Sequence, residues 1–416
     1  MNWFKELFHL PREHVRIAFS MSLAGSFLLG GYEFIRSSSG SLFKAAYGAD
    51  AMPYMLAALP FAMMLAIWLY GRTLSAFGPR RTLLLTSIVS ALLIFAGYFA
   101  VSYGSKFATA LVYILREAYV IVILEQYWSF MNSRMSESSA KKLNGPVCGV
   151  ASLGPIVCGL LVNKYAVSLG SVTMLLGAAV FTLLAAGLAE FAYSRVNTHD
   201  LDLSAHKAKH GSLALDLFRK EKVLVCLFAL ILCTQAVSTF LTLHFEKITQ
   251  LAMPDRDQQT AYMGLFYSSL NGAALFLQFV LAPLLLRFVR VRWIHVLIPL
   301  VHIAACVWLV LHPSLLSAAA FAYFLFKVLD YSIFRAAKEI FYIPLSFDAR
   351  HRAKEVIDVF GYRSGKGAIS LGIIASEQVG LVLRSVYGWL SLAVLGVWLG
   401  FAWKLTKTAK LASPEA

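Results

Sequence analysis

The chain has 416 residues, of which 59% are hydrophobic and 14% are charged. This balance excludes an ordinary soluble globular protein and is typical of an integral membrane protein. The 37 Lys and Arg residues outnumber the 22 Asp and Glu residues, which gives a formal net charge of +15. Because no soluble domain is large enough to carry this charge, we do not expect a nucleic-acid-binding protein.

About twelve stretches are apolar over a membrane-spanning length of ~20 residues. They lie near 14–36, 52–72, 82–103, 107–131, 145–166, 171–194, 222–245, 260–286, 293–312, 315–343, 355–380 and 386–404. We therefore predict an all-α integral membrane protein with about 12 transmembrane helices. The longest polar stretch divides the spans into two sixes, which favours the 6+6 pseudo-symmetric bundle of the major-facilitator plan. The predicted domains are an N-terminal six-helix bundle, a cytoplasmic linker, a C-terminal six-helix bundle and a cytoplasmic tail, at 1–194, 195–221, 222–404 and 405–416.

The distribution of basic residues predicts which loops face the cytoplasm. With the N-terminus inside, the inside segments hold about 24 of the 37 Lys and Arg residues, and the outside loops hold about six. We therefore expect a multi-pass protein of the bacterial inner membrane with both termini cytoplasmic. The segment from Met1 to Pro11 has no signal-peptide cleavage site and is either an amphipathic surface helix or a frayed end.

The first span ends in a segment of charged and small residues. Glu33 and Arg36 are three residues apart, so they can pair on one face of a helix. The pair is either part of a site inside the membrane or a salt bridge at the surface end of the helix. The residues from Ser37 to Gly40 indicate close helix packing or the wall of a pocket.

The loop after the second span, at 71–81, resembles the basic, glycine-bounded loop signature of major-facilitator proteins. Ser75 stands where that signature has an acid. The loop after the eighth span repeats the basic cluster with Arg287, Arg290 and Arg292. The positive-inside rule alone also explains both clusters.

The fourth span carries charged and aromatic residues that share one broad helical face. They are Glu117, Glu125, Trp128 and Asn132, with Arg116 directly before them. A buried carboxylate beside an aromatic ring indicates a proton or ligand site. The alternative is that these acids pair with arginines and only hold helices together.

The most informative stretch is 321–378, where two apolar runs carry many charges. They are Lys327, Asp330, Arg335, Lys338 and Glu339 in the first run, and Glu355, Asp358, Arg363, Lys366 and Glu377 in the second. A charge at the bilayer centre costs about 2.5–3.5 kcal/mol, so charges at this density cannot face lipid. At about 100° per residue, Lys327, Asp330 and Lys338 fall in one narrow sector. We expect them to face a polar interior, which makes this stretch the default functional site.

Several motifs in these spans resemble those of the ATP/ADP translocase family, the nucleotide transporters of plastids and intracellular bacteria. The most specific one runs from Lys338 to Leu345 and is similar to the family's Lys-Glu followed by Tyr-Ile-Pro-Leu. Weaker similarities lie at 353–359, 363–366, 48–53 and 125–129, and at the first-helix arginine, Arg36. The resemblance implies a divergent member of this family, within the major facilitator superfamily.

The chain departs from the family pattern at three places. Ser39 and Gly40 stand where family members have Lys and Asp after the first-helix arginine. Arg335 stands where the family has Asp, and 353–356 replaces its Gly-Lys-Ala-Ala. The lost first-helix lysine weakens the implication that nucleotides are the substrate, whereas the implied fold and transport role do not depend on it.

We therefore hypothesise a secondary active transporter of a small anionic solute, nucleotide-like or otherwise phosphorylated or carboxylated, that works by alternating access. Since the sequence has no P-loop for ATP hydrolysis, the energy is expected to come from exchange or a proton gradient. The predicted substrate-binding residues are cations in the spans and two polar or aromatic neighbours: Arg36, Arg116, Lys327, Arg335, Lys338, Arg363, Lys366, Trp128 and Asn271. The predicted coupling or ion-pairing acids are Glu33, Glu117, Glu125, Asp330, Glu339 and Asp358.

Two other functions stay open. The 30 Phe, 18 Tyr and 8 Trp residues also suit an exporter of amphiphilic or multi-carboxylate compounds, for example siderophore-like molecules, on the same fold. A non-transporting membrane scaffold or sensor would use the charges only as structural pairs. An enzyme active site, a cofactor and a metal site are not expected. The expected partners are the anionic solute and the lipid bilayer, with protons as a candidate coupled ion, no nucleic acid and a monomeric state.

Overall fold

The computed structural model of the chain describes residues 12–134, 137–194, 218, 221–343, 345 and 357–408. Every regular element within these residues is a helix, which confirms the predicted all-α class. The expected surface helix at 1–11, nearly all of the linker and of the loop at 344–356, and most of the tail lie outside the described residues.

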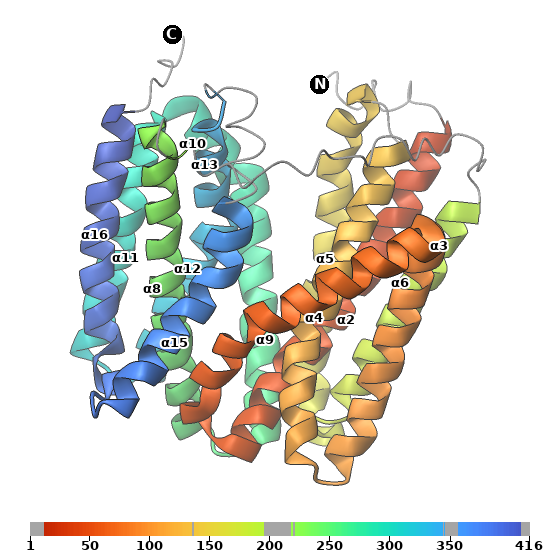
Figure 1. Cartoon of the computed structure of the whole chain (residues 1–416), viewed down its shortest axis with the longest axis horizontal. Helices are drawn as coiled ribbons and strands as arrows, with labels where there is room; N and C mark the ends of the chain where they lie inside the picture. Colours follow the sequence, from red (N-terminus) through yellow and green to blue (C-terminus); the bar gives the residue numbers. More distant parts are fainter. Residues whose placement is uncertain are drawn as a thin grey trace. The chain divides into compact units, whose positions relative to one another are not determined.

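The first half of the sequence forms long helices, coloured from red to yellow-green in Figure 1. They are α2 (Arg12–Tyr47), α3 (Met52–Ser102), α4 (Lys106–Arg134), α5 (Glu137–Leu169) and α6 (Met174–Ser194), with a short 3-10 turn, η1 (Ala49–Ala51), before α3. The element α3 covers the predicted spans 52–72 and 82–103. The two helices meet at a kink at Gly78, and no long loop separates them. Gly78 has φ 72°, a left-handed backbone that glycine adopts without strain.

The second half of the sequence forms a further series of helices, coloured from green to blue in Figure 1. They are α8 (Lys222–Ala252), α9 (Arg256–Phe276), η4 (Leu277–Leu281), α10 (Ala282–Phe288), α11 (Val291–Leu311), α12 (Leu316–Leu329), η5 (Asp330–Phe334), α13 (Arg335–Ile340), η7 (Ile357–Ser364), α15 (Gly365–Gln378), η8 (Leu383–Val386) and α16 (Tyr387–Thr408). The elements η4, η5 and η7 are π-helical turns, so the helices on either side of η4 and of η5 continue as single rods.

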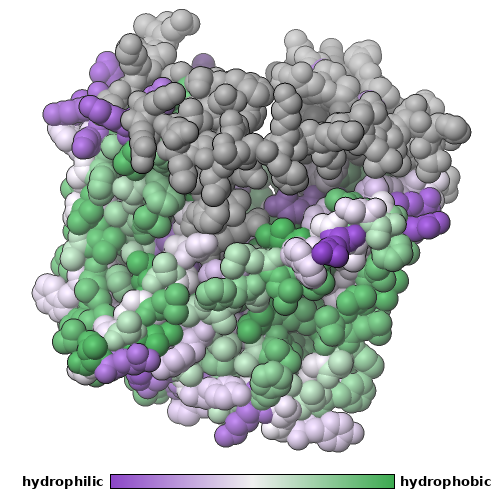
Figure 2. Space-filling model, in the orientation of Figure 1, coloured by the Kyte–Doolittle hydropathy of each residue, from purple (hydrophilic) through white to green (hydrophobic). Residues whose placement is uncertain are grey.

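In the described part of the chain, 10 helices are long and apolar enough to cross a membrane. Two of the twelve expected spans lie together in α3, and the span at 355–380 is only partly described, so the number twelve stays a prediction. Figure 2 shows hydrophobic side chains over the sides of the helices, with hydrophilic ones toward the helix ends. Phe61, Leu92 and Trp389 are among the large apolar residues on the surface. Such surfaces are stable against lipid, as expected for a multi-pass membrane protein.

The described residues form two compact units. Unit 1 comprises the described residues within Met1–Gly48, Phe61–Ala208 and Asp255–Gly272, and unit 2 comprises those within Ala49–Pro60, Lys209–Pro254 and Ala273–Ala416. Each unit therefore includes a short segment from the other half of the sequence: the start of α3 in unit 2 and most of α9 in unit 1. The predicted domain boundaries at 194 and 222 stay predictions.

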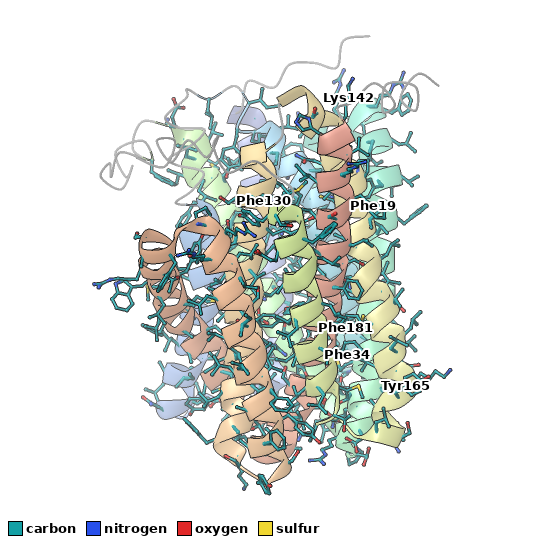
Figure 3. The ribbon with its side chains drawn as sticks, turned by 90° about the vertical axis from the view of Figure 1, so that its right-hand side faces the viewer. Phe19, Phe34, Phe130, Lys142, Tyr165 and Phe181 are labelled. Atoms are coloured by element: carbon teal, nitrogen blue, oxygen red, sulfur yellow. The ribbon has the colours of Figure 1, made fainter. Side chains whose placement is uncertain are left out.

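In unit 1 the core is built around α2, which packs against α4, α5 and α6. Glycine allows the closest of these approaches: a Cβ added to Gly154 of α5 would lie 1.9 Å from the carbonyl oxygen of Ser26. Phe34 of α2 and Phe181 of α6 meet edge to face with their ring centroids 5.3 Å apart (Figure 3). The middle of α2 is thus enclosed by its neighbours, and polar groups there must find partners inside the unit.

In unit 2, α8 packs against α12, α15 and α16, and α11 packs against α12 and α16. Trp398 of α16 is buried in this core, with its ring 5.5 Å from that of Phe334 and 5.7 Å from that of His302. These contacts hold the rod of α12, η5 and α13 against α11 and α16. The charged side chains on that rod therefore project from a firmly packed element.

Candidate functional site

The first candidate cluster lies on the middle of α2 in unit 1. Glu33 is fully buried, and Nη1 of Arg36 lies 3.7 Å from its Oε2. Ser37 Oγ donates a hydrogen bond to Glu33 Oε1 over 3.1 Å, and Asn271 Nδ2 of α9 donates to Oε2 over 3.1 Å. Glu33 and Arg36 therefore pair inside the unit, and the alternative of a salt bridge at the surface end of the helix is wrong.

The second arginine of this cluster comes from α4. Nε of Arg116 lies 3.1 Å from Oε1 of Glu117, and Nη1 donates to Ser39 Oγ over 3.0 Å and to the carbonyl oxygen of Arg36 over 3.3 Å. The Tyr32 hydroxyl donates to the same Glu117 oxygen over 3.4 Å. These bonds join α2 to α4 and place two guanidinium groups and two carboxylates in one network, in which Glu33 is fully buried and the other three groups are partly buried.

Aromatic rings support both guanidinium groups. The Cζ atom of Arg36 lies 3.7 Å from the centre of the Tyr267 ring, and that of Arg116 lies 3.7 Å from the centre of the Tyr113 ring. Cation–π contacts of this kind contribute about 0.5–2 kcal/mol, and more when they are desolvated. A stacked guanidinium keeps its N–H donors in its own plane, where they can bind a carboxylate or a phosphate.

The other predicted residues of α4 lie away from this network. Glu125 is exposed and follows Arg116 by nine residues, or about 13 Å along a helix. Trp128 is half-buried and meets Tyr127 edge to face with centroids 5.4 Å apart. The side chain of Asn132 lies outside the described set. A role for Glu125 and Trp128 in binding or coupling stays a prediction.

The second candidate cluster lies on the rod of α12, η5 and α13 in unit 2. Lys327 is buried, and its Nζ donates a hydrogen bond to Ser238 Oγ of α8 over 2.9 Å. The same ammonium lies 5.3 Å from the centre of the Tyr331 ring. Asp330 is also buried, and no described group forms a hydrogen bond with its Oδ1. A cation and an anion thus lie within one turn of the same rod inside the unit.

A π-helical turn separates this pair from the later charges of the same rod. The turn at Asp330–Phe334 has more residues per turn than an α-helix. The residues after it therefore lie on other helical faces than those predicted at about 100° per residue. Lys338 remains buried, with its Nζ 4.9 Å from the centre of the Tyr362 ring and 3.9 Å from Oε1 of Glu339. Arg335, in contrast, is exposed.

The remaining predicted residues follow position 356 in the sequence. Asp358 and Arg363 belong to the π-helical element η7, but their side chains lie outside the described set. Lys366 is half-buried in the first turn of α15. Their proposed roles stay predictions.

Sequence reasoning did not name three of the side chains that contact these cations. Tyr113 precedes Arg116 by three residues on α4, a spacing that predicts a shared helical face, so a signal for it was present. Tyr267 and Ser238 reach their partners from other helices. No local pattern points to such contacts, because they depend on how the helices pack.

The helical fold and the buried charges define a multi-pass membrane protein with the fold of major-facilitator transporters. A solved structure of a mutant of the nucleoside transporter NupG matches with a TM-score of 0.68 and 12% identity, covering 94% of this chain and 99% of that one. A D-xylose-proton symporter matches with a TM-score of 0.65 and 13% identity over 94% and 97% of the two chains. An auto-inhibited POT family peptide transporter matches with a TM-score of 0.63 and 15% identity over 97% and 98%. These matches confirm the predicted fold.

Sequence comparison gives a more particular similarity. Residues 280–408 match the family described as TLC ATP/ADP transporter. The ADP,ATP carrier protein 3 of Rickettsia prowazekii (strain Madrid E) is 23% identical over 327 residues, which cover 67% of this chain and 64% of that protein. The match therefore spans less than two thirds of that relative's length. The predicted resemblance to the ATP/ADP translocase family is confirmed.

Proposed function

We propose that the protein is a secondary active transporter of a small anionic solute that works by alternating access. The observation that carries this proposal is the buried cluster in which Arg36 and Arg116 stack on tyrosine rings beside carboxylate partners. Ionised side chains within membrane spans are costly and by default mark a path for a substrate or an ion. The solved structures that share the fold are described as transporters, which supports the same role.

The chemistry of the cluster favours an anion. A guanidinium group presents paired N–H donors that match two oxygens of a phosphate or a carboxylate. Glu33 and Glu117 occupy these donors in part and balance the two positive charges. An arriving anion exchanges one ionic partner for another, so binding does not leave a buried charge uncompensated. Such an exchange of internal pairs can bias the two states of a transporter.

Nucleotides are the substrate class that the similarities favour. The matched residues 280–408 include Lys327 and Lys338, two buried cations that suit a solute with several phosphates. The Rickettsia relative is described as an ADP,ATP carrier protein. Ser39 and Gly40, which replace the family's Lys and Asp, widen the class to other phosphorylated or carboxylated metabolites.

The charge distribution of the loops supports an orientation for the proposed transporter. The excess of Lys and Arg in alternate loops supports both termini in the cytoplasm. We place the protein in the inner membrane of a bacterium, as a monomer, with exchange or a proton gradient as the energy source.

The test is uptake by purified protein in liposomes that are preloaded in turn with nucleotides, sugar phosphates or polycarboxylates. With the transported solute, Arg116→Gln should lower the uptake rate by about 10- to 100-fold, since a hydrogen bond to a charged group contributes about 1.5–3 kcal/mol. Arg72→Gln is the matched control, because Arg72 is exposed and stacks on Trp68 at 4.7 Å, apart from the cluster. Wild-type uptake of every anion by Arg116→Gln contradicts the proposal. Transport of amphiphilic compounds alone would favour an exporter.

A further inference from the structure

A cavity of about 380 Å³ lies at one end of unit 2. It is lined by η1, the start of α3, the last turns of α8, the connection before α12, η8 and the start of α16. Its polar lining residues are Asp50, His244, Lys247, Arg384, Ser385 and Tyr387. All of them belong to unit 2. The cavity is separate from the two clusters described above, and Ala49, Asp50 and Pro53 of the motif at 48–53, which the proposed transport site does not use, line it.

Two cations in this cavity converge on one carboxylate oxygen. Nζ of Lys247 lies 2.9 Å from Oδ2 of Asp50, and Nη1 of Arg384 lies 3.0 Å from the same atom. The side chains of Asp50, Lys247 and Arg384 are 43%, 39% and 36% exposed. Water therefore reaches all three groups, and each of them can change partners without a large desolvation cost.

A second acid fixes the guanidinium of Arg384 in place. Glu377 binds two nitrogens of Arg384, Nε over 2.7 Å and Nη2 over 3.0 Å, which leaves Nη1 directed at the Asp50 carboxylate. The ring nitrogen Nε2 of His244 donates to the carbonyl oxygen of Pro313 over 3.0 Å, and both residues line the cavity. The guanidinium is thus positioned by one acid and presented to another, which is a preorganised arrangement for an oxyanion.

We propose that this cavity is a binding site for the phosphate or carboxylate group of a soluble anion, and that Asp50 is its internal occupant when no ligand is bound. The ligand class rests on the proposed function, whereas the site itself rests on the geometry of unit 2. A phosphate dianion can place two oxygens against Lys247 and Arg384 at once. Asp50 offers one oxygen and one charge to the same two cations, so a phosphate that displaces it gains a second oxygen contact and a second charge.

Removal of Asp50 separates this proposal from a purely structural salt bridge. Binding of inorganic pyrophosphate to the purified full-length protein is measured by calorimetry at low salt. Asp50→Asn should lower the dissociation constant about tenfold, because the internal competitor is lost while both cations remain. Asp50→Glu keeps the competitor and should bind as the wild type does. Asp50→Ser serves as a second removal variant if Asp50→Asn does not fold.

Two matched variants control for net charge and for location. Asp255→Asn removes an equal charge from an exposed carboxylate just after α8 that does not line the cavity, and should leave binding unchanged. Adding Lys247→Gln to Asp50→Asn should abolish the gain. Each measurement is repeated in an Arg36→Gln background, which removes a cation of the proposed transport site. A gain in pyrophosphate affinity that persists there arises at the cavity and does not depend on the proposed function.

The proposal fails if Asp50→Asn binds pyrophosphate within twofold of the wild type, or if the gain persists without Lys247. A lipid headgroup offers the same phosphate chemistry, so dihexanoyl phosphatidic acid is titrated in parallel. A gain for pyrophosphate supports the assignment to a soluble anion. A gain confined to the lipid overturns it.

Discussion

Asn271 on α9 donates a hydrogen bond to the buried carboxylate of Glu33 on α2, although the two residues are 238 positions apart in the sequence. The bond lies inside unit 1, because most of α9 belongs to that unit. It completes the set of partners that a fully buried carboxylate requires, together with Arg36 and Ser37. This network, the second cluster in unit 2 and the packing of α2 against α5 can be tested at four places.

The first prediction concerns the charge of Glu33. Glu33→Gln preserves the size of the side chain but leaves Arg36 without its buried counter-charge. We expect a loss of about 3–5 kcal/mol in the free energy of unfolding, the range for breaking one side of a buried ion pair. Denaturant unfolding in detergent measures this loss in the free energy of unfolding. Glu190→Gln breaks the Arg80 pair, whose side chains are partly exposed, and should cost about 0–1 kcal/mol. Equal losses would contradict the prediction.

The second prediction separates the ring of Tyr267 from its hydroxyl group. Tyr267→Phe keeps an aromatic face under Arg36, whereas Tyr267→Leu removes it. For the transported anion, we expect Tyr267→Leu to raise the half-saturating concentration about fivefold, since the cation–π contact contributes about 1 kcal/mol. Tyr267→Phe should stay within twofold of the wild type. If the two variants behave alike, the ring does not position the guanidinium.

The third prediction tests the buried contact of Lys327. Ser238→Ala removes the hydroxyl that accepts the hydrogen bond from its ammonium, and should lower the free energy of unfolding by about 1.5–3 kcal/mol. In a Lys327→Met background the same substitution should cost less than about 1 kcal/mol, because no buried charge is left without an acceptor. A double-mutant cycle measures this difference. An identical cost in both backgrounds would show that the bond does not stabilise the fold.

The fourth prediction concerns two glycines on α5. A Cβ at position 154 would lie 1.9 Å from the carbonyl oxygen of Ser26, which is fixed helix backbone. Gly154→Ala should therefore force α2 and α5 apart and destabilise the protein by about 3 kcal/mol or more. Gly149→Ala is the control, since a Cβ there meets nothing within 4 Å and should stabilise the helix by about 0.5–1 kcal/mol. Thermal unfolding of both variants in detergent decides between these outcomes.

The composition and the spacing of the residues were enough to determine the membrane class, the all-helical fold and the burial of several charges. Lys327 and Lys338 are each only 3% exposed, as their place in an apolar run requires. Glu33 and Arg36 pair as their spacing of three allows. These features are local or depend on the cost of exposing polar groups to lipid, so they can be inferred without knowing which helices touch.

Only the tertiary structure decided which groups meet. Tyr267 lies under Arg36 because α9 packs in unit 1, and Arg384 reaches Asp50 because η1 packs against α8 beside the cavity that η8 also lines in unit 2. The π-helical turn at Asp330–Phe334 shifts the register of the following residues, which leaves Arg335 exposed beside the buried Lys338. Side chains that are far apart in the sequence meet through helix packing, and helix packing depends on the shapes of all the surrounding side chains together.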